Sequence, residues 1–267
     1  MAKQVDRQAD KPGETDSSSR YTTPALEKGL DILELFASTS EELSKREVAR
    51  RLGRTVSEIF RMLVCLEERG YLAQSPGEDR LRLTLKLFKL GQEYPPVKRL
   101  TEKAIPIMHD VTQKTNQSCH LGVLDGGQVI ILAQVDAPTS TGFYVKAGSS
   151  VDLMEAATGH VILAYQRPEI RDLAIREWQR DTKQEIPEDL EKHLAKIRQC
   201  GYEQRESYQV SGVINISFPI FDDQGYAIAA LSIPFLKRIK DQTTAEDVRA
   251  YLRQASLQVS KEIGGDR

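Results

Sequence analysis

Apolar residues recur every three or four positions along residues 24–70, which is the spacing of the buried face of a helix. The first such run follows Thr23-Pro24, and proline is favoured at the first position of a helix. Residues 44–47 and 55–58 each consist of Ser or Thr, two further residues and Glu, which is a capping box that begins a helix. Gly53 separates these two starts. The pattern therefore predicts three helices joined by short turns.

After the third predicted helix, apolar and polar residues follow the shorter spacing that is typical of strands. Residues 71–74 and 80–83 are strand-like, and residues 75–79 between them have the composition of a turn, so they predict a β-hairpin. Three short helices followed by a hairpin are the order of a winged helix-turn-helix, whose last helix enters the major groove of DNA. A further helix is expected over residues 84–94, and Pro95-Pro96 should end it.

The rest of the chain mixes both patterns, and its strand–turn–strand neighbours favour an antiparallel sheet. We expect strands at residues 119–124, 129–135, 143–146, 202–207, 214–221 and 227–235. We expect helices around residues 100–111, kinked at Pro106, and at residues 156–165, 170–178, 188–199 and 243–263.

The fold class that follows is α+β, with two folded domains. Residues 1–20 are almost free of apolar side chains, and we interpret them as a flexible tail. Residues 21–83 form the predicted winged helix-turn-helix domain, residues 84–96 a linker helix, and residues 97–267 a second domain.

Composition narrows the possible functions. The 267 residues carry 37 Lys and Arg against 39 Asp and Glu, a net charge of −2, so a DNA-binding surface must arise from local charge. Three scattered cysteines predict neither a disulfide framework nor a zinc motif, and fit a reducing cytoplasm. We find no signal peptide and no apolar run long enough to span a membrane.

Motifs of catalysis and of metal binding are missing from the sequence. The four histidines lack HExxH spacing, and GxSxG, Walker and GxGxxG motifs do not occur. Residues 222–225 have the composition of an ordinary hairpin turn rather than of a metal loop. We therefore expect no catalytic residues, no metal and no cofactor.

Positive charge is concentrated just before the third predicted helix, which would enter the major groove. Residues 43–54 hold five Lys and Arg against one Glu, and could neutralise phosphates. Ser57 and Arg61 lie opposite the apolar stripe of the third helix. The candidate DNA-binding residues are Lys45, Arg46, Arg54, Thr55, Ser57, Phe60, Arg61 and Arg80, the last on the hairpin.

Several of these residues have a second interpretation. A charge run on a short helix is often only a solvated face. Glu58 could accept a hydrogen bond from a cytosine amino group, although its capping-box position explains it without any base contact. Phe60 could touch a thymine methyl group or pack on the hairpin.

In this order, the motifs resemble the IclR family of bacterial transcription regulators over nearly the whole chain after the tail. Residues 43–72, ending in Gly-Tyr-Leu, look like the helix-turn-helix of that family, and residues 80–91 like its wing and linker. Residues 123–127, 157–159 and 218–232 are similar to its ligand domain.

The resemblance implies a GAF-like ligand domain, a homodimer or dimer of dimers, and DNA binding altered by a small, often carboxylated or aromatic, metabolite. The pocket positions that it implies are Leu153, Ala157, Thr158, Arg205, Asn215, Ser232 and Pro234. The chain departs from the usual family pattern at Met154, His160, Arg205 and Asn215, so the effector cannot be carried over from the family.

The residues themselves agree with a ligand site in part. Alternation along residues 214–220 puts Asn215 and Ser217 on the face opposite the bulky apolar row. Arg205 could hold a carboxylate with two parallel hydrogen bonds, or it could be a plain surface arginine. Asn215 and Ser232 could equally bind buried backbone groups.

The sequence thus predicts a regulator that binds double-stranded operator DNA and a small-molecule effector, does not contact a membrane, and is not an enzyme. The alternative is a metabolite sensor that acts mainly through protein–protein contacts, with the winged helix as the interaction module.

Overall fold

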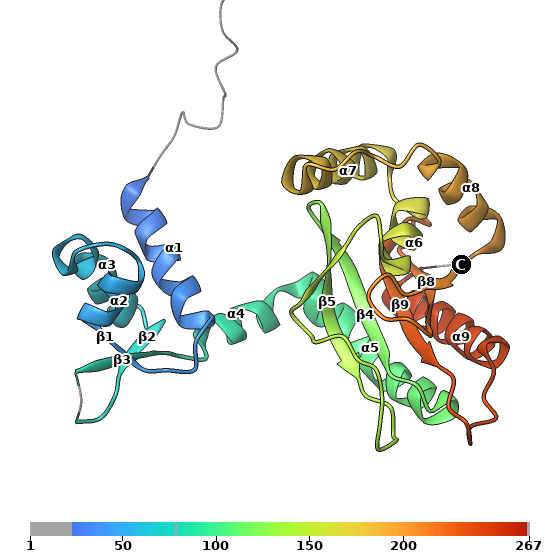
Figure 1. The fold of residues 1–267 in the computed structure, drawn as a ribbon, viewed down its shortest axis with the longest axis horizontal. Coiled ribbons are helices and arrows are strands. Elements are labelled where there is room, and N and C mark those ends of the chain that lie inside the picture. Colours follow the sequence, from blue (N-terminus) through green and yellow to red (C-terminus); the bar gives the residue numbers. More distant parts are fainter. Residues whose placement is uncertain (1–22, 78, 266–267) are drawn as a thin grey trace, which may run out of the picture. The chain divides into compact units, whose positions relative to one another are not determined.

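The computed structural model describes residues 23–77 and 79–265, and within it the chain divides into two compact units between Gly91 and Gln92 (Figure 1). The predicted flexible tail, residues 1–20, lies outside the described residues. Each unit has its own hydrophobic core, so each is described separately.

The N-terminal unit contains the predicted helices and hairpin in the predicted order. Its elements are α1 (Pro24–Ala37), β1 (Leu43–Ser44), α2 (Lys45–Arg51), α3 (Val56–Glu68), β2 (Leu72–Gln74) and β3 (Arg80–Leu83), and α4 (Lys86–Glu93) follows. The short strand β1 was not predicted; it pairs with β3 and makes a three-stranded sheet of order β1-β3-β2. Two residues are too few to show an alternating pattern in sequence.

Local capping fixes where the helices of this unit begin. Ser44 and Thr55 each accept a hydrogen bond from the backbone N–H three residues later. The carboxylates of Glu47 and Glu58 accept one in turn from the backbone N–H of Ser44 and Thr55. Both capping boxes predicted from sequence are therefore confirmed. Ile59 and Leu63 of the apolar stripe of α3 pack with α1 and the strands, and the fully buried residues at the centre of this core are Ile32, Leu43, Ile59, Leu63, Leu72 and Leu81.

The C-terminal unit is built on an antiparallel sheet of order β6-β5-β4-β9-β8-β7. Its strands are β4 (Cys119–Asp125), β5 (Gln128–Val135), β6 (Ser150–Asp152), β7 (Glu203–Glu206), β8 (Val213–Phe221) and β9 (Ala227–Leu236). Its helices are α5 (Pro95–Thr115), α6 (Ala157–Tyr165), α7 (Pro168–Thr182), α8 (Leu190–Cys200) and α9 (Ala245–Ile263). The expected α+β class is confirmed.

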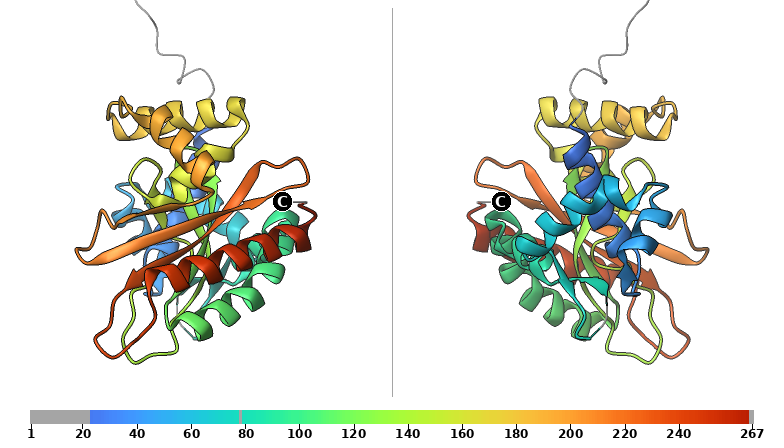
Figure 2. Two further views of the ribbon diagram at one scale, coloured as in Figure 1. Left: turned by 90° about the vertical axis from the view of Figure 1, so that its right-hand side faces the viewer. Right: turned by 90° about the vertical axis from the view of Figure 1, so that its left-hand side faces the viewer.

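Helices cover both faces of this sheet (Figure 2). On one face, α5 and α9 pack against the bulky row of β8 and β9, including Ile216, Phe218 and Leu231. On the other face, α6, α7 and α8 enclose a second core with Ile131 and Trp178. No described helix is both long and apolar enough to cross a membrane.

Two sequence predictions for this unit are wrong. Residues 143–146 alternate like a strand but form a loop, and the chain reaches the edge of β5 only where Gly148 donates to the carbonyl of Ile131, so the strand is Ser150–Asp152. The last helix, α9, begins at Ala245, two residues after the predicted start at residue 243. Thr244 caps it with Asp247, because a carboxylate three residues after either threonine satisfies the same pattern.

Candidate functional site

The outer face of α3 presents polar groups to solvent. Ile59 and Leu63 point into the core, whereas Ser57 and Arg61 are exposed and Phe60 is 47% exposed. Among the described residues Arg61 forms no ion pair, so its guanidinium is available to a partner. This face has the exposure that a helix in the major groove of DNA requires.

The basic run before α3 is less free than its composition indicates. Arg54 Nη2 lies 2.7 Å from an Asp31 carboxylate oxygen, and Lys45 Nζ lies 3.8 Å from Asp79. Arg51 is paired with Glu41. Arg46, which is exposed, has no ion pair among the described residues. Neighbouring carboxylates therefore offset part of the local excess of positive charge.

Arg80 has a structural role in this unit. Its Nη1 donates to the carbonyl of Glu42 at 2.6 Å and lies 3.3 Å from the Glu47 carboxylate, so it joins β3 to the capping box of α2. Thr55 is likewise engaged as the cap of α3, and its hydrogen bonds lower the pKa of Glu58. Phe60 lies beneath Lys45, whose Nζ is 5.9 Å from the ring centre.

In the C-terminal unit, polar side chains form a row across neighbouring strands. His120 of β4 is directly opposite Ser232 of β9, Ser232 is opposite Ser217 of β8, and Ser217 is opposite Glu203 of β7. Residues directly opposite each other in a sheet share a face. We call these four residues the polar row; each is buried.

Helix α6 covers the polar row. Thr158 Oγ1 lies 2.8 Å from Ser232 Oγ and 3.5 Å from His120 Nε2, and the hydroxyls of Ser217 and Ser232 are 2.6 Å apart. Burial lowers the pKa of His120 to about 4, so the imidazole is neutral at pH 7. Its Nδ1 has no hydrogen-bond partner among the described residues.

A second set of cross-strand partners lies two residues further along. Pro234 is opposite Asn215, and Asn215 is opposite Arg205 at the sheet edge. Arg205 is partly exposed, and its Nη1 lies 3.1 Å from His160 Nδ1 and 3.8 Å from Glu203. The arginine is therefore near the polar row and reachable from solvent.

Both units match models of a single protein family. Residues 25–76 match the IclR helix-turn-helix domain, and residues 93–261 match the C-terminal domain of the bacterial transcriptional regulator IclR.

The chain belongs to the IclR family.

Relatives and solved structures match about nine tenths of this chain, across both units. The HTH-type transcriptional regulator KdgR of Dickeya chrysanthemi is 30% identical, over 92% of this chain and 86% of the relative. XynR of Escherichia coli strain K12 is 26% identical over 90% and 97% of the two chains. The IclR structure from Thermotoga maritima covers 90% of this chain and 98% of its own, with a TM-score of 0.69 and 25% identity.

A further structure shows the same fold at 22% identity, with a TM-score of 0.72. It is an IclR homolog from Microbacterium hydrocarbonoxydans in complex with 4-hydroxybenzoate, and it covers 90% of this chain and 98% of its own.

This IclR-family chain is a transcriptional regulator with a helix-turn-helix DNA-binding domain, and not an enzyme.

In this IclR-family member, five of the seven positions implied for the pocket lie at the start of α6 or contact this helix, and Asn215 and Pro234 are placed by the register of the sheet. Leu153 is buried in the loop before α6 and Ala157 is its first residue; the helix packs so closely on that loop that a Cβ on Gly159 would lie 2.3 Å from the Leu153 carbonyl oxygen. The approach of α6 to the sheet depends on a glycine of β4 instead, because a Cβ on Gly122 would lie 2.8 Å from Thr158 Cγ2.

Sequence reasoning missed several residues of this cluster. Ser217 was recognised as polar on an apolar strand, but it was not assigned to the site. Nothing local indicates that Glu203, His160 and His193 meet, because they come from three different elements. Only the register of the sheet and the position of α6 and α8 bring them together.

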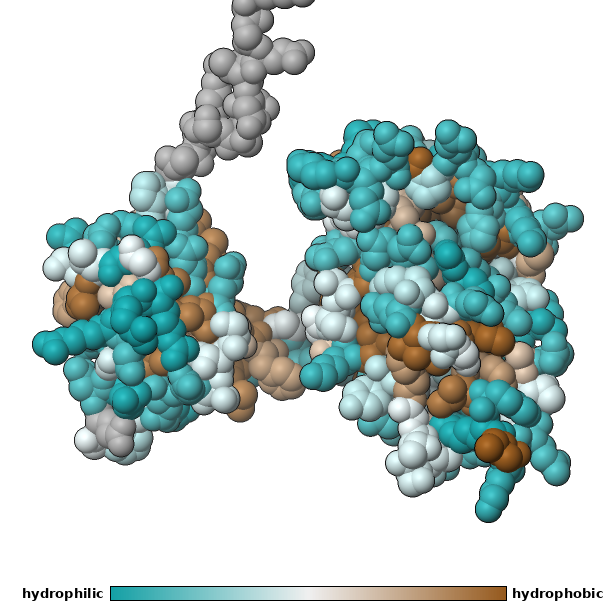
Figure 3. Space-filling model, viewed as in Figure 1, coloured by the Kyte–Doolittle hydropathy of each residue, from teal (hydrophilic) through white to brown (hydrophobic). Residues whose placement is uncertain are grey.

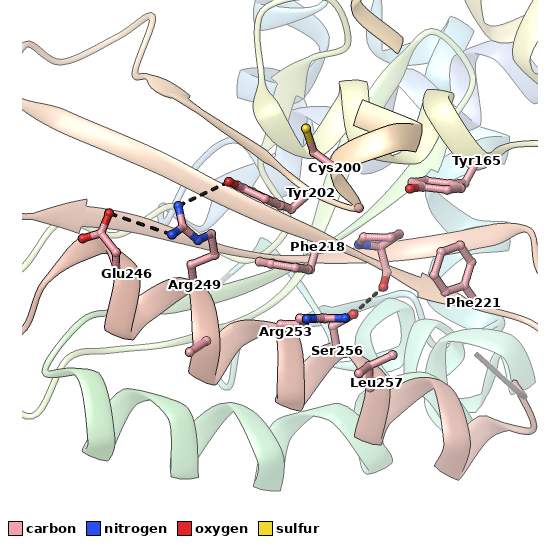
Figure 4. Close-up of a pocket in the computed structure, with 13 residues that line it drawn as sticks. Tyr165, Cys200, Tyr202, Phe218, Phe221, Glu246, Arg249, Arg253, Ser256 and Leu257 are labelled. Carbon is pink, nitrogen blue, oxygen red and sulfur yellow. Dashed lines mark hydrogen bonds and ion pairs between the residues drawn. The ribbon is translucent and has the colours of Figure 1, made fainter. Parts of the chain in front are cut away.

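A separate cavity of about 460 Å³ lies on the α9 side of the sheet (Figure 4). We call it the α9 cavity. Arg249 lies in its wall, with its Nη1 3.2 Å from the hydroxyl of Tyr202, and Arg253 and Phe218 also line it. None of the residues that the resemblance implies for the pocket lines this cavity.

Proposed function

We propose that this regulator binds operator DNA through α3 and that a small carboxylate held over the polar row changes that binding. The observation that carries the proposal is the buried polar row beneath α6, in which His120 has a nitrogen without a partner among the described residues, with the partly exposed Arg205 next to Glu203 at its β7 end. A buried polar atom without a partner is costly unless a ligand or water satisfies it.

On the DNA side, Ser57 and Arg61 would reach base edges while Lys45 and Arg46 contact phosphates. Arg54 could join them by exchanging Asp31 for a phosphate, since both are anionic oxygen partners. Thr55 and Phe60 lie at the start of the same surface. Arg80 would act indirectly, by holding the hairpin against α2.

Exposed apolar residues favour a homodimer or dimer of dimers. Leu85 and Phe88 around α4 are 72% and 64% exposed, and Leu26 on α1 is 60% exposed. Residues of α4 appear as a hydrophobic patch in Figure 3. Exposed apolar side chains gathered on one helix, as on α4, favour an interface, and a second copy of the chain would place two copies of α3 on one operator.

The effector side favours an anion. Arg205 can donate two parallel hydrogen bonds to a carboxylate, and the first turn of α6, whose Thr158 lies against Ser232, is a helix N-terminus and favours negative charge. Neutral His120 and the hydroxyls of Thr158 and Ser232 would then bind the uncharged part of the ligand. The related Microbacterium structure holds 4-hydroxybenzoate, which makes this compound the first probe to use.

A thermal-shift titration of the full chain with 4-hydroxybenzoate and with short aliphatic carboxylates tests the effector site. We expect at least one of these probes to raise the melting temperature of the wild-type chain and of Arg249→Ala, and to leave that of Arg205→Ala unchanged. Arg249 is the matched control, because it is an arginine of the α9 cavity. If Arg249→Ala loses the response and Arg205→Ala keeps it, the ligand binds in the α9 cavity and the assignment is wrong.

The dependence of DNA affinity on salt tests the DNA side. Phosphate contacts release counterions, so we expect the affinity for duplexes selected from a random pool to fall steeply with salt concentration. DNA binding without any salt dependence would instead favour the alternative, in which the winged helix contacts another protein.

A further inference from the structure

Two histidines and a glutamate meet at the β7 end of the polar row. Glu203 is 3% exposed, and its Oε1 lies 2.9 Å from His193 Nε2 of α8. Its Oε2 lies 3.1 Å from His160 Nδ1 of α6. One ligating atom from each of the three residues lies within 4.8 Å of the other two. These residues come from three different elements and form a compact cluster of nitrogen and oxygen atoms.

His160 turns a lone pair towards Glu203. Its Nε2 lies 2.7 Å from the carbonyl oxygen of Met154, so Nε2 carries the hydrogen and donates it. Arg205 Nη1 lies 3.1 Å from Nδ1, and a guanidinium can only donate, so Nδ1 accepts there. Nδ1 is also 3.1 to 3.2 Å from both Glu203 oxygens, which are acceptors too. Acceptors repel one another at this distance, and a cation bound between His160 Nδ1 and the Glu203 oxygens would remove that repulsion.

We propose that His160, His193 and Glu203 bind a divalent transition-metal ion, with Zn²⁺ as the first candidate. Two imidazoles and one carboxylate are a ligand set of Zn²⁺ and of its neighbours in the first row, and are not the all-oxygen set of Ca²⁺ or Mg²⁺. Ligands of a tetrahedral zinc ion lie roughly 3.3 Å apart, so small side-chain rotations suffice. The site goes beyond the proposed function and requires neither DNA nor effector.

The surroundings supply the other features of a metal site. The Met154 carbonyl fixes the orientation of the His160 ring, as the outer partners of metal-bound histidines do. His193 is 35% exposed and lines a cavity of about 160 Å³, together with Glu203 and Cys200, which provides an entry path. Three protein ligands leave one position of a tetrahedral ion for water or an anion.

Arg205 is the competing cation of this site. Its Nη1 lies 3.8 Å from Glu203 Oε1 and supplies positive charge to the buried carboxylate. A bound metal ion would take over that role and repel the guanidinium. Arg205→Gln, which removes this charge, should therefore bind the metal ion at least as tightly as the wild type does. If the cluster is only a structural network of hydrogen bonds, neither chain binds the ion.

The test uses the full chain, freed of metal by a chelator and then titrated with ZnCl₂ by calorimetry and with CoCl₂ by visible absorption. We expect one equivalent of ion per chain and the absorption bands of Co²⁺ bound to nitrogen and oxygen. His193→Gln should weaken binding about tenfold or more, and Glu203→Gln similarly. His109→Gln is the matched control, because His109 is exposed on α5 and distant in sequence from the cluster; its binding should equal that of the wild type.

Two results would overturn the site. One is the absence of a bound equivalent of either ion in the wild-type chain. The other is binding that survives in His193→Gln but is lost in Cys65→Ser/Cys200→Ser, because the ion would then sit on the exposed thiols. His193 is partly exposed, so its substitution is compatible with folding, which circular dichroism of the metal-free variant verifies. These readouts are made without effector or DNA, so failure here leaves the proposed function untouched.

Discussion

The two units of the chain place their polar chemistry in opposite ways. In the N-terminal unit, the side chains that we propose for DNA binding lie on the solvent face of α3, while the opposite stripe of the same helix packs in the core. In the C-terminal unit, the polar row lies inside the fold, between the sheet and α6. An exposed helix face suits a large, rigid and charged partner such as DNA, whereas a buried polar row suits a small molecule that can be enclosed.

This difference also separates the energetics of the two sites. Exposed cations such as Arg61 contribute little to folding and can be changed with small effects on stability. Buried polar groups such as His120 and Ser232 must be satisfied, so their protonation and hydrogen bonding affect the stability of the whole unit. Substitutions in the proposed DNA-binding surface should therefore change DNA binding with little effect on folding stability. Substitutions in the polar row should change ligand binding and folding stability together.

The largest expected effect comes from deleting core volume in one unit only. Leu63→Ala should destabilise the N-terminal unit by about 2–5 kcal/mol and abolish DNA binding, because Leu63 is fully buried in its core. Urea unfolding followed by Trp178 fluorescence reports on the other unit, since Trp178 is the only tryptophan of the chain. Its midpoint should stay unchanged. A shift of this midpoint would break the comparison, because the two cores would then unfold together.

The next effect concerns the buried histidine. Unfolded histidine has a pKa near 6.5, whereas burial lowers that of His120 to about 4, so between these values the unfolded state binds more protons. The free energy of unfolding is therefore unaffected by the protonation of His120 above pH 6.5, and it falls by about 3 kcal/mol in total as the pH is lowered towards 4. Urea unfolding of the wild type and of His120→Gln at several pH values measures it. The variant should show a shallower slope, and equal slopes would mean that His120 is not held neutral.

Much of the N-terminal unit could be predicted because its information is local. A capping box is complete within four residues, and the apolar stripe of α3 is visible without knowing the rest of the fold. What local patterns could not show is which cations are paired, since Arg54 meets Asp31 from another helix. The predicted site residues of α3 remain predictions until DNA binding is measured.

The C-terminal site could be predicted only in part, because its geometry depends on register. Alternation identified Ser217 and Asn215 as polar positions on an apolar strand, but not their partners. The polar row exists because β4, β9, β8 and β7 align His120, Ser232, Ser217 and Glu203 side by side. The meeting of His160 with His193 depends further on how α6 and α8 pack, which no short motif encodes.

A smaller effect sharpens the difference on the DNA side. Arg61→Ala should weaken binding to a selected duplex by about 1–3 kcal/mol and relax sequence preference, if its guanidinium reads a base. Lys45→Ala should weaken binding to all DNA sequences to the same extent. Arg69 is an exposed arginine at the end of α3, and Arg69→Ala should change the DNA affinity little. Fluorescence anisotropy with matched and scrambled duplexes measures all three. An unchanged sequence preference in Arg61→Ala would remove it from the reading surface.

The most direct test of the whole account is the affinity for one operator duplex with and without the carboxylate that the thermal-shift titration selects. Coupling between two sites usually changes affinity between 5-fold and 150-fold, so we expect a change of about fivefold or more in the wild type and none in Arg205→Ala. An identical Kd for wild-type chain in the presence and absence of saturating carboxylate would contradict the claim that the buried site controls the exposed one.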